Sequence, residues 1–318
     1  MPLKKALFDA YERNLYYLRL SITDKCQFSC SYCREKNGMF LPEKKLLTGD
    51  ELFRLVRIFG KMGTRKVRIT GGEPLMRKDS ASIIEKIHDL GLRTALTTNG
   101  LKLKEILPKV RGKLDSVNVS LDTINPETFE RISRMPGELL GIVVDSITAA
   151  KKEGIPIKLN SVVIEENEEE IVNLVDFASS LSIPIRFIEY MTMESGRQSV
   201  PISKVKEKIR NERGLSREYG TFGDGPASYF RTDDGAVVGF ISYTVPHFCD
   251  TCNRLRITSD GKLRLCLILG IELDLKKMFA NGADDEEIIG KITEFVKRKP
   301  FSHGENLILK KNMNSIGG

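Results

Sequence analysis

The amino-acid sequence predicts an α/β fold in which a parallel β-sheet with helical crossovers is followed by a smaller α+β region. Short apolar, β-branched runs alternate six times with amphipathic helical patterns, which is typical of successive strand–helix units. Signals for the start and the end of helices fall between these runs. Near residue 196 the alternation gives way to two hairpin patterns, each built around an Asp-Gly pair.

The first strand–helix units occupy residues 16–90. Residues 16–22 (YYLRLSI) form the first predicted strand, and residues 66–69 form the second. Between them, Thr48 and Glu51 have the spacing of a capping box and predict the start of a helix. A second helix is expected over residues 80–90, where Gly91 would end it.

The remaining units follow the same order. Asn125 and Pro126 suit the N-cap and the first position of a helix, and Gly154 would end a longer helix over residues 139–153. Another helix is expected over residues 168–181. Further strands are predicted at residues 93–98, 116–121, 156–164 and 184–191. This series fits either a doubly wound open sheet or an incomplete (β/α) barrel, and periodicity does not choose between them.

Beyond Gly196 the sequence predicts a second, smaller region. Residues 229–243 (YFRTDDGAVVGFISY) and 255–269 (LRITSDGKLRLCLIL) each have the pattern of a hairpin around Asp-Gly. Two helices and a polar tail follow these hairpins. We therefore expect the chain to divide into residues 1–196 and 197–318.

Composition narrows the class of protein. The 318 residues are 41% hydrophobic, enough to bury a full core, and no apolar run reaches the about 18 residues that a membrane span needs. The first residues lack the apolar core of a signal peptide, so a cytoplasmic location is expected. A net charge of +7 suits an anionic ligand, but the basic residues are scattered and do not signal a nucleic-acid surface. With only three histidines, the chemistry is expected to depend on other residues.

The six cysteines form two triplets. In a reducing cytosol, cysteines at such short spacing are more often metal ligands or catalysts than disulfide partners. Each triplet is one ligand short of a closed tetrahedral zinc site and of a fully ligated iron–sulfur cluster. Spacing alone leaves two readings open: zinc knuckles, or 4Fe–4S clusters with one iron free to bind a small molecule. The two triplets are Cys26, Cys30 and Cys33, and Cys249, Cys252 and Cys266.

Cysteine, glycine and polar residues also follow the predicted strands. They lie at the carboxyl ends of the strands, where parallel α/β proteins bind ligands. The first strand leads into Cys26, and the second leads into TGGEPLMR, where Gly71 and Gly72 would let backbone approach a ligand closely. The third ends in TTNG, the fourth in Ser-Leu-Asp and the sixth in Glu-Tyr-Met. Taken together, these residues predict a site at this end of the sheet.

The pattern Cys-x3-Cys-x2-Cys, with Tyr32 before its last cysteine and GGEP one strand–helix unit later, resembles the radical S-adenosylmethionine superfamily. The resemblance implies a partial barrel of six units and a 4Fe–4S cluster held by the first triplet. It also implies that the open iron is chelated by the amino and carboxylate groups of S-adenosylmethionine. An electron from the cluster then cleaves the sulfonium and yields a 5′-deoxyadenosyl radical.

Seven further segments resemble the GTP 3′,8-cyclase family, which carries out the first step of molybdenum cofactor biosynthesis. The match runs from about residue 15 to residue 318. It implies that the second triplet holds a second 4Fe–4S cluster, whose open iron receives the purine of GTP, and that the two sites face each other across the barrel. The segments are LRLSITDKCQFSCSYC, VRITGGEPLMR, LTTNG, VNVSLD, RFIEYM, FCDTCNRLRIT and the terminal IGG.

The same resemblance implies three groups of site residues. Contacts to S-adenosylmethionine are expected at Tyr32, Gly72, Ser120 and Met191. Contacts to GTP are expected at Arg19, Arg68, Thr97, Lys158, Arg254, Leu255 and Arg256. The planar fork of arginine suits phosphate oxygens, which fits a polyanionic substrate. Catalytic roles are expected for Arg256 and for the tail residues Gly317 and Gly318, whose small size suits a narrow channel.

The implied reaction converts GTP to (8S)-3′,8-cyclo-7,8-dihydroguanosine 5′-triphosphate. The deoxyadenosyl radical takes the ribose 3′-hydrogen, the 3′ carbon adds to C8 of guanine, and a final reduction completes the product. The implied partners are GTP, an external one-electron donor and a downstream cyclic pyranopterin monophosphate synthase. The chain is expected to be a monomer or a homodimer, and to bind neither nucleic acid nor a membrane. Two alternatives remain: a two-cluster radical enzyme acting on RNA or a peptide, and a zinc-binding nucleic-acid adaptor.

Overall fold

The structure is a computed structural model that describes residues 6–33, 38–191, 199–218, 222–243, 249–302 and 316. The predicted tail residues Gly317 and Gly318 lie outside the described residues. Within the described parts of the chain, no helix is long and apolar enough to cross a membrane.

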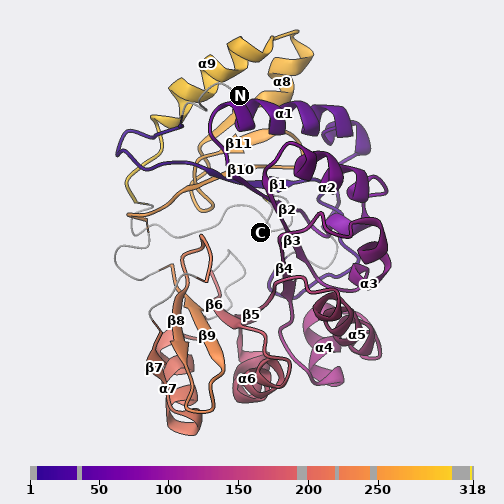
Figure 1. Cartoon of the computed structure of the whole chain (residues 1–318), viewed down its shortest axis with the longest axis vertical. Coiled ribbons are helices and arrows are strands. Elements are labelled where there is room, and N and C mark those ends of the chain that lie inside the picture. Colours follow the sequence, from indigo (N-terminus) through magenta and orange to yellow (C-terminus); the bar gives the residue numbers. More distant parts are fainter. Residues whose placement is uncertain are drawn as a thin grey trace.

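The described strands form one curved sheet of twelve strands (Figure 1). Its order is β12-β11-β10-β1-β2-β3-β4-β5-β6-β9-β8-β7. The six predicted strands are confirmed as β1 (Tyr17–Ser21), β2 (Lys66–Thr70), β3 (Arg93–Thr98), β4 (Ser116–Ser120), β5 (Ile157–Val163) and β6 (Ile185–Glu189). These six are parallel and lie in sequential order. A doubly wound sheet reverses its order at a switch point, so this order identifies the barrel type.

The strands after residue 196 extend both edges of this sheet. The two predicted hairpins are confirmed as antiparallel pairs, β8–β9 and β10–β11. β9 pairs in parallel with β6, whereas β10 pairs in parallel with β1, so the hairpins continue the sheet at opposite edges. The division of the chain near residue 196 stays a prediction. The bounds are β7 (Ser216–Arg217), β8 (Ser228–Arg231), β9 (Val237–Ile241), β10 (Arg254–Ile257), β11 (Lys262–Arg264) and β12 (Glu272–Asp274).

The crossover helices lie along the outer side of the curved sheet (Figure 1). Both predicted helix starts are confirmed: Thr48 and Glu51 form a complete capping box, and the Asn125 side chain accepts two backbone N–H groups ahead of Pro126. The helices are α1 (Gly49–Lys61), α2 (Ser80–Asp89), α3 (Leu103–Ile106), α4 (Pro126–Ser133), α5 (Leu139–Lys152), α6 (Ile171–Ser180), α7 (Ile202–Arg213), α8 (Leu275–Ala280) and α9 (Asp285–Val296).

One predicted helix begins later than expected. Residues Glu165–Glu170 form a 3-10 turn, and α6 starts only at Ile171. The Asn167 side chain accepts the backbone N–H of Ile164, and its amide donates to the carbonyls of Asp122 and Val162. These bonds tie the segment to the ends of β4 and β5, which is a tertiary contact that helical periodicity does not reveal.

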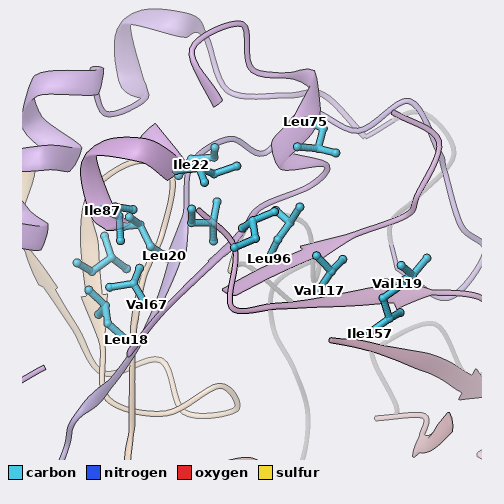
Figure 2. Packing of buried hydrophobic residues seen from close by; sticks show 14 of the residues in the cluster. Leu18, Leu20, Ile22, Val67, Leu75, Ile87, Leu96, Val117, Val119 and Ile157 are labelled. Carbon is cyan, nitrogen blue, oxygen red and sulfur yellow. The ribbon is translucent and has the colours of Figure 1, made fainter. Parts of the chain in front are cut away.

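Alternate residues of the strands pack against the helices and form the apolar core (Figure 2). Leu18 and Leu20 of β1 and Val67 of β2 lie in this layer with Ile87 of α2. Burial of each such side chain contributes about 1.5–3 kcal/mol. Because successive strand residues point to opposite faces, the residues between them face the interior of the curve. In β1 and β2 the interior positions include Arg19 and Arg68.

Candidate active site

The first cysteine triplet lies in the loop that follows β1. All three thiols are half-buried and none forms a disulfide. The Cys33 N–H donates to the carbonyl of Cys30 at 2.9 Å, which forms a tight turn in the loop. Burial raises the pKa of Cys30 well above its ordinary value, and the neighbouring Cys33, Asp122 and Cys26 raise it further. The raised pKa describes the thiol form; a bound metal centre would supply the positive charge that stabilises thiolates here.

The backbone of the GGEP loop, which follows β2, packs closely against the backbone of the segment that leads into Cys26. A Cβ atom at Gly71 would lie 2.4 Å from the carbonyl oxygen of Thr23, and one at Gly72 would lie 2.5 Å from the carbonyl oxygens of Asp24 and Lys25. The Gly72 N–H donates to the Thr23 carbonyl at 2.8 Å. These glycines are therefore required by the approach of two backbone segments; the contact of Gly72 with S-adenosylmethionine stays a prediction.

Glu73 joins this loop to the end of β3. Its fully buried carboxylate accepts the Thr98 hydroxyl at 2.8 Å and the Asn99 N–H at 2.7 Å. Burial raises the pKa of Glu73 to about 7, although these hydrogen bonds act in the opposite direction. Asn99 in turn places its amide nitrogen 3.9 Å from the sulfur of Cys26. We did not single out Glu73 from the sequence, although the GGEP motif contains it.

Replacing Gly72 by alanine is expected to destabilise the protein by on the order of 3 kcal/mol, because the added Cβ meets two backbone oxygens that cannot rotate away. Chemical unfolding of the purified protein measures this loss, and iron content should fall with it. Gly141→Ala is the matched control, since Gly141 lies in α5 with open space around it and should change stability by no more than about 1 kcal/mol. A Gly72→Ala protein as stable as wild type would contradict this account.

The other residues predicted to bind S-adenosylmethionine also lie at the carboxyl end of the strands. Tyr32 donates its hydroxyl to Asp122 at 2.6 Å, and Asp122 also accepts the Val162 N–H at 2.8 Å. Burial and then the charge of Asp122 raise the pKa of Tyr32 well above its ordinary value, so the phenol stays protonated. Ser120 is half-buried at the end of β4, and Met191 is half-buried just after β6.

The second triplet lies at the opposite end of the strands. Cys249 and Cys252 precede β10, which is parallel to β1, whereas the first triplet follows β1. Cys266 follows β11, which is antiparallel to β10, so it returns to the same end as Cys252. β1 has five residues and spans about 17 Å, which sets the scale of the separation between the triplets.

The surroundings of Cys252 favour a thiolate. Burial alone would raise the pKa of Cys252, but the charges of Arg254 and Lys299 outweigh it and lower the pKa to about 7. Arg254 places a guanidinium nitrogen 3.8 Å from the Cys252 sulfur. Lys299 is only 4% exposed and donates to the carbonyl of Leu265, next to Cys266. A low-pKa thiol beside positive charge, as at Cys252, is suited to metal ligation.

Arg13 holds the start of the triplet in place. Its guanidinium donates to the carbonyls of Cys249 at 2.8 Å, Pro300 at 2.7 Å and Phe301 at 2.8 Å. Neither Arg13 nor Lys299 was predicted from the sequence, because a basic residue near a chain end carries no signal of burial. Their partners are up to 288 residues away along the chain.

Basic side chains line the interior of the sheet between the two triplets. Arg256, Arg19 and Arg68 lie in register on β10, β1 and β2. Burial, and then the charges of Arg19 and Arg254, hold the pKa of Arg256 well below its ordinary value. For Lys158, burial and then Arg186 lower the pKa to about 8. Burial is the larger cause of both shifts and neighbouring positive charge the smaller, and a bound polyanion would favour the charged forms.

Two more predicted substrate residues have different surroundings. Thr97 is half-buried on β3 and accepts a bond from the Arg68 guanidinium at 3.4 Å. Leu255 is 1% exposed and belongs to the apolar core. A substrate contact at Leu255 would therefore use its backbone. Lys66 and Arg186 are additional buried cations of this region that we did not predict.

A cavity of about 530 Å³ lies beside the second triplet, at the amino end of the strands. Asp224 lies on its wall and accepts bonds from Lys66 at 2.9 Å and Arg93 at 3.0 Å. Tyr16 also donates to this carboxylate, at 3.2 Å. The lining residues are Tyr11, Glu12, Arg13, Asn14, Tyr16, Gly223, Asp224, Gly225, Pro226, Asp250, Thr251, Asn253 and Arg254.

The chemistry of the donors decides what the triplets can hold. Among the residues the structure describes, no group of three or more His, Cys, Asp or Glu side chains is gathered around the position of a single metal ion. Each triplet offers three thiols that form no disulfide. Iron–sulfur clusters take one thiolate per iron, so three thiols fit a 4Fe–4S cluster with one iron left for another ligand.

Two family models cover most of the chain. The model described as the radical SAM superfamily matches residues 20–178. The model described as Molybdenum Cofactor Synthesis C matches residues 183–305.

Curated relatives match over nearly the whole length. A GTP 3′,8-cyclase of Marinobacter nauticus is 38% identical over 98% of this chain and 98% of the relative. One of Thermodesulfovibrio yellowstonii is also 38% identical, over 98% of this chain and 99% of the relative. Molybdenum cofactor biosynthesis protein 1 of Mus musculus is 38% identical over 95% of this chain, which spans 49% of the mouse protein.

Among solved structures, SuiB of Streptococcus suis bound to S-adenosylmethionine superposes with a TM-score of 0.61. The match covers 87% of this chain and 67% of SuiB at 16% identity. At that identity the likeness establishes a shared fold.

Proposed function

Because the chain belongs to the GTP 3′,8-cyclase family of radical S-adenosylmethionine enzymes, we propose that its two cysteine triplets hold the two clusters of that reaction and that the basic interior between them binds GTP. The chain converts GTP to 3′,8-cyclo-7,8-dihydroguanosine triphosphate, the first step of molybdenum cofactor biosynthesis. Its cofactors are S-adenosylmethionine and two 4Fe–4S clusters. When bound, these cofactors supply the 5′-deoxyadenosyl radical that takes the ribose 3′-hydrogen.

The observation that carries this assignment of sites is the placement of the triplets. They lie at opposite ends of the same parallel strands, with Arg19, Arg68 and Arg256 in register between them. A substrate held by these arginines would present one end to each triplet. Cys26, Cys30 and Cys33 would hold the cluster that binds S-adenosylmethionine, and Cys249, Cys252 and Cys266 would hold the other.

The residues of the interior bind and orient the substrate. An arginine guanidinium can donate two parallel hydrogen bonds to phosphate oxygens. Lys158, whose pKa is about 8, would become fully protonated beside a phosphate. Arg256 lies near Cys252 and Cys266, and we assign it to the base end of GTP. At the other end, Tyr32, Gly72, Ser120 and Met191 would surround S-adenosylmethionine and exclude water from the radical.

The tail is assigned to the same interior. Ile316, two residues before the end of the chain, is 1% exposed, which supports a C-terminus that reaches inward. Gly317 and Gly318 would then enter the site, where they could contact GTP without steric conflict. The external electron donor, the downstream synthase, the monomeric or homodimeric state and the cytoplasmic location stay predictions.

Anaerobic purification tests the assignment directly. We expect about eight irons and eight sulfides per chain, and 5′-deoxyadenosine that forms with GTP but not with ATP when dithionite and S-adenosylmethionine are supplied. Metal analysis and chromatography of the quenched reaction measure both. In the wild-type protein, a colourless preparation with about one zinc per triplet, or deoxyadenosine formation that does not depend on GTP, would contradict the proposal.

A further inference from the structure

Tyr17 lies among the basic side chains of the sheet interior, which include Arg19, Arg68 and Lys158. It is the first residue of β1 and is 5% exposed. Its phenol oxygen accepts a hydrogen bond from the Nε of Arg68 at 2.6 Å, a short distance of the kind found in charge-assisted bonds. The ammonium of Lys66 lies 5.1 Å from the centre of its ring.

Cations approach Tyr17 from its own strand and from neighbouring strands, and Arg254 of β10 is its partner in register. Arg19 comes from the same strand, and Lys66 and Arg68 come from β2. Across the interior, Lys158 of β5 and Arg186 of β6 also interact with Tyr17, whose negative charge opposes the lowering of their pKa by burial. The carboxylate of Asp224 is bound to Lys66, one of these cations, at 2.9 Å. A second phenol, Tyr229, lies near Arg186 and Lys158, but burial raises its pKa and keeps it protonated.

This environment changes the protonation of Tyr17. Burial would raise the pKa of the phenol, but the charges of Arg68, Arg19 and Lys66 outweigh burial and lower the pKa to about 7. At pH 7 about half of the molecules would carry a phenolate, against almost none at the usual value of about 10. A phenolate balances part of the positive charge before any substrate is present.

We propose that Tyr17 is a positioning residue of the substrate site. Its negative charge balances the surrounding cations until GTP binds, and the negative charge of the triphosphate then replaces it. In the nucleotide-free protein its phenolate holds the guanidinium of Arg68 in place. When the triphosphate arrives, its oxygens take over the cations, and the phenolate accepts one proton from solvent to become a neutral phenol. This inference rests on the proposed function, because it takes the triphosphate to bind among these cations.

The expected proton uptake follows from the pKa of Tyr17. If the pKa returns toward about 10 on binding, Tyr17 takes up about 0.5 proton at pH 7, about 0.9 at pH 8 and about 0.1 at pH 6. Lys158, with a pKa of about 8, adds about 0.1 proton at pH 7 and about 0.5 at pH 8. Tyr17 therefore dominates at pH 7. Any proton released by GTP itself is common to all variants and cancels in their difference.

Calorimetric titration of the holoenzyme with GTP, without S-adenosylmethionine, tests the exchange. At pH 7, in buffers of different ionisation enthalpy, wild type should take up about 0.5 proton more than Tyr17→Phe. Tyr16→Phe is the matched control, because burial raises the pKa of this neighbouring phenol and keeps it protonated. Lys158→Arg removes the other titrating group, and adding Tyr17→Phe to that variant should still lower the uptake by about 0.5 proton at pH 7. Equal uptake in wild type and Tyr17→Phe would overturn the proposal.

A second measurement needs no variant and so stands if Tyr17→Phe fails to fold. Ultraviolet resonance Raman spectra of the wild-type holoenzyme at pH 8 should contain a tyrosinate band that disappears when GTP is added. A spectrum without tyrosinate before GTP is added would overturn the proposal. A protein that cyclises GTP but lacks this signal refutes the role of Tyr17 alone, whereas a protein that does not bind GTP refutes the proposed function.

Discussion

Replacing Cys266 by alanine is expected to abolish GTP cyclisation while S-adenosylmethionine cleavage continues at a reduced rate. Cys266 follows β11 at the amino end of the parallel strands, whereas the first triplet follows β1 at the carboxyl end. Loss of one ligand should therefore remove the second cluster and spare the first. Iron content should fall from about eight to about four atoms per chain. Deoxyadenosine and cyclised nucleotide, assayed from the same reaction, measure the two outcomes separately.

Cys33→Ala is the matched control for this experiment. It removes one ligand of the first triplet, so both deoxyadenosine formation and cyclisation should be lost, again with about four irons remaining. If Cys266→Ala lost both activities to the same extent as Cys33→Ala, the second triplet would not be a separate substrate site.

Replacing Arg256 by methionine should weaken transition-state stabilisation for GTP by about 2–5 kcal/mol, which is a loss of about 30-fold or more in kcat/KM. Arg256 is 9% exposed, and within the described residues its Nη1 has no hydrogen-bond partner. A buried guanidinium with unused donors among other cations is suited to a bound anion. Steady-state kinetics with GTP measure the loss, and thermal unfolding should show a protein that remains folded.

Arg264→Met is the control for a buried arginine that serves the fold. Arg264 is 2% exposed and donates to Glu272 at 2.6 Å and to the carbonyls of Leu267 and Leu269. Its loss leaves Glu272 without this partner and should lower stability by about 3–5 kcal/mol. If Arg256→Met lost stability in the same way and kept its affinity for GTP, Arg256 would be a structural residue and not a substrate ligand.

Features that depend on neighbours in the chain were predictable from the sequence. The capping box of Thr48 and Glu51 and the cap at Asn125 are confirmed because they join groups only two or three residues apart. The hairpins around Asp-Gly are confirmed for the same reason. The cysteine spacing and GGEP identified the superfamily, since a cluster loop must present its thiols over a short stretch of chain.

Features that depend on distant pairing were decided by the tertiary structure. The sequence by itself determined six strand–helix units, two cysteine triplets and the family to which they belong. Only the structure placed β10 beside β1, and with it the second triplet at the opposite end from the first. It also buried Arg13 and Lys299 against that triplet and set Tyr17 among cations of several strands. Periodicity reports which face of a strand is buried, whereas the partner across the sheet is chosen by contacts between residues far apart in the chain.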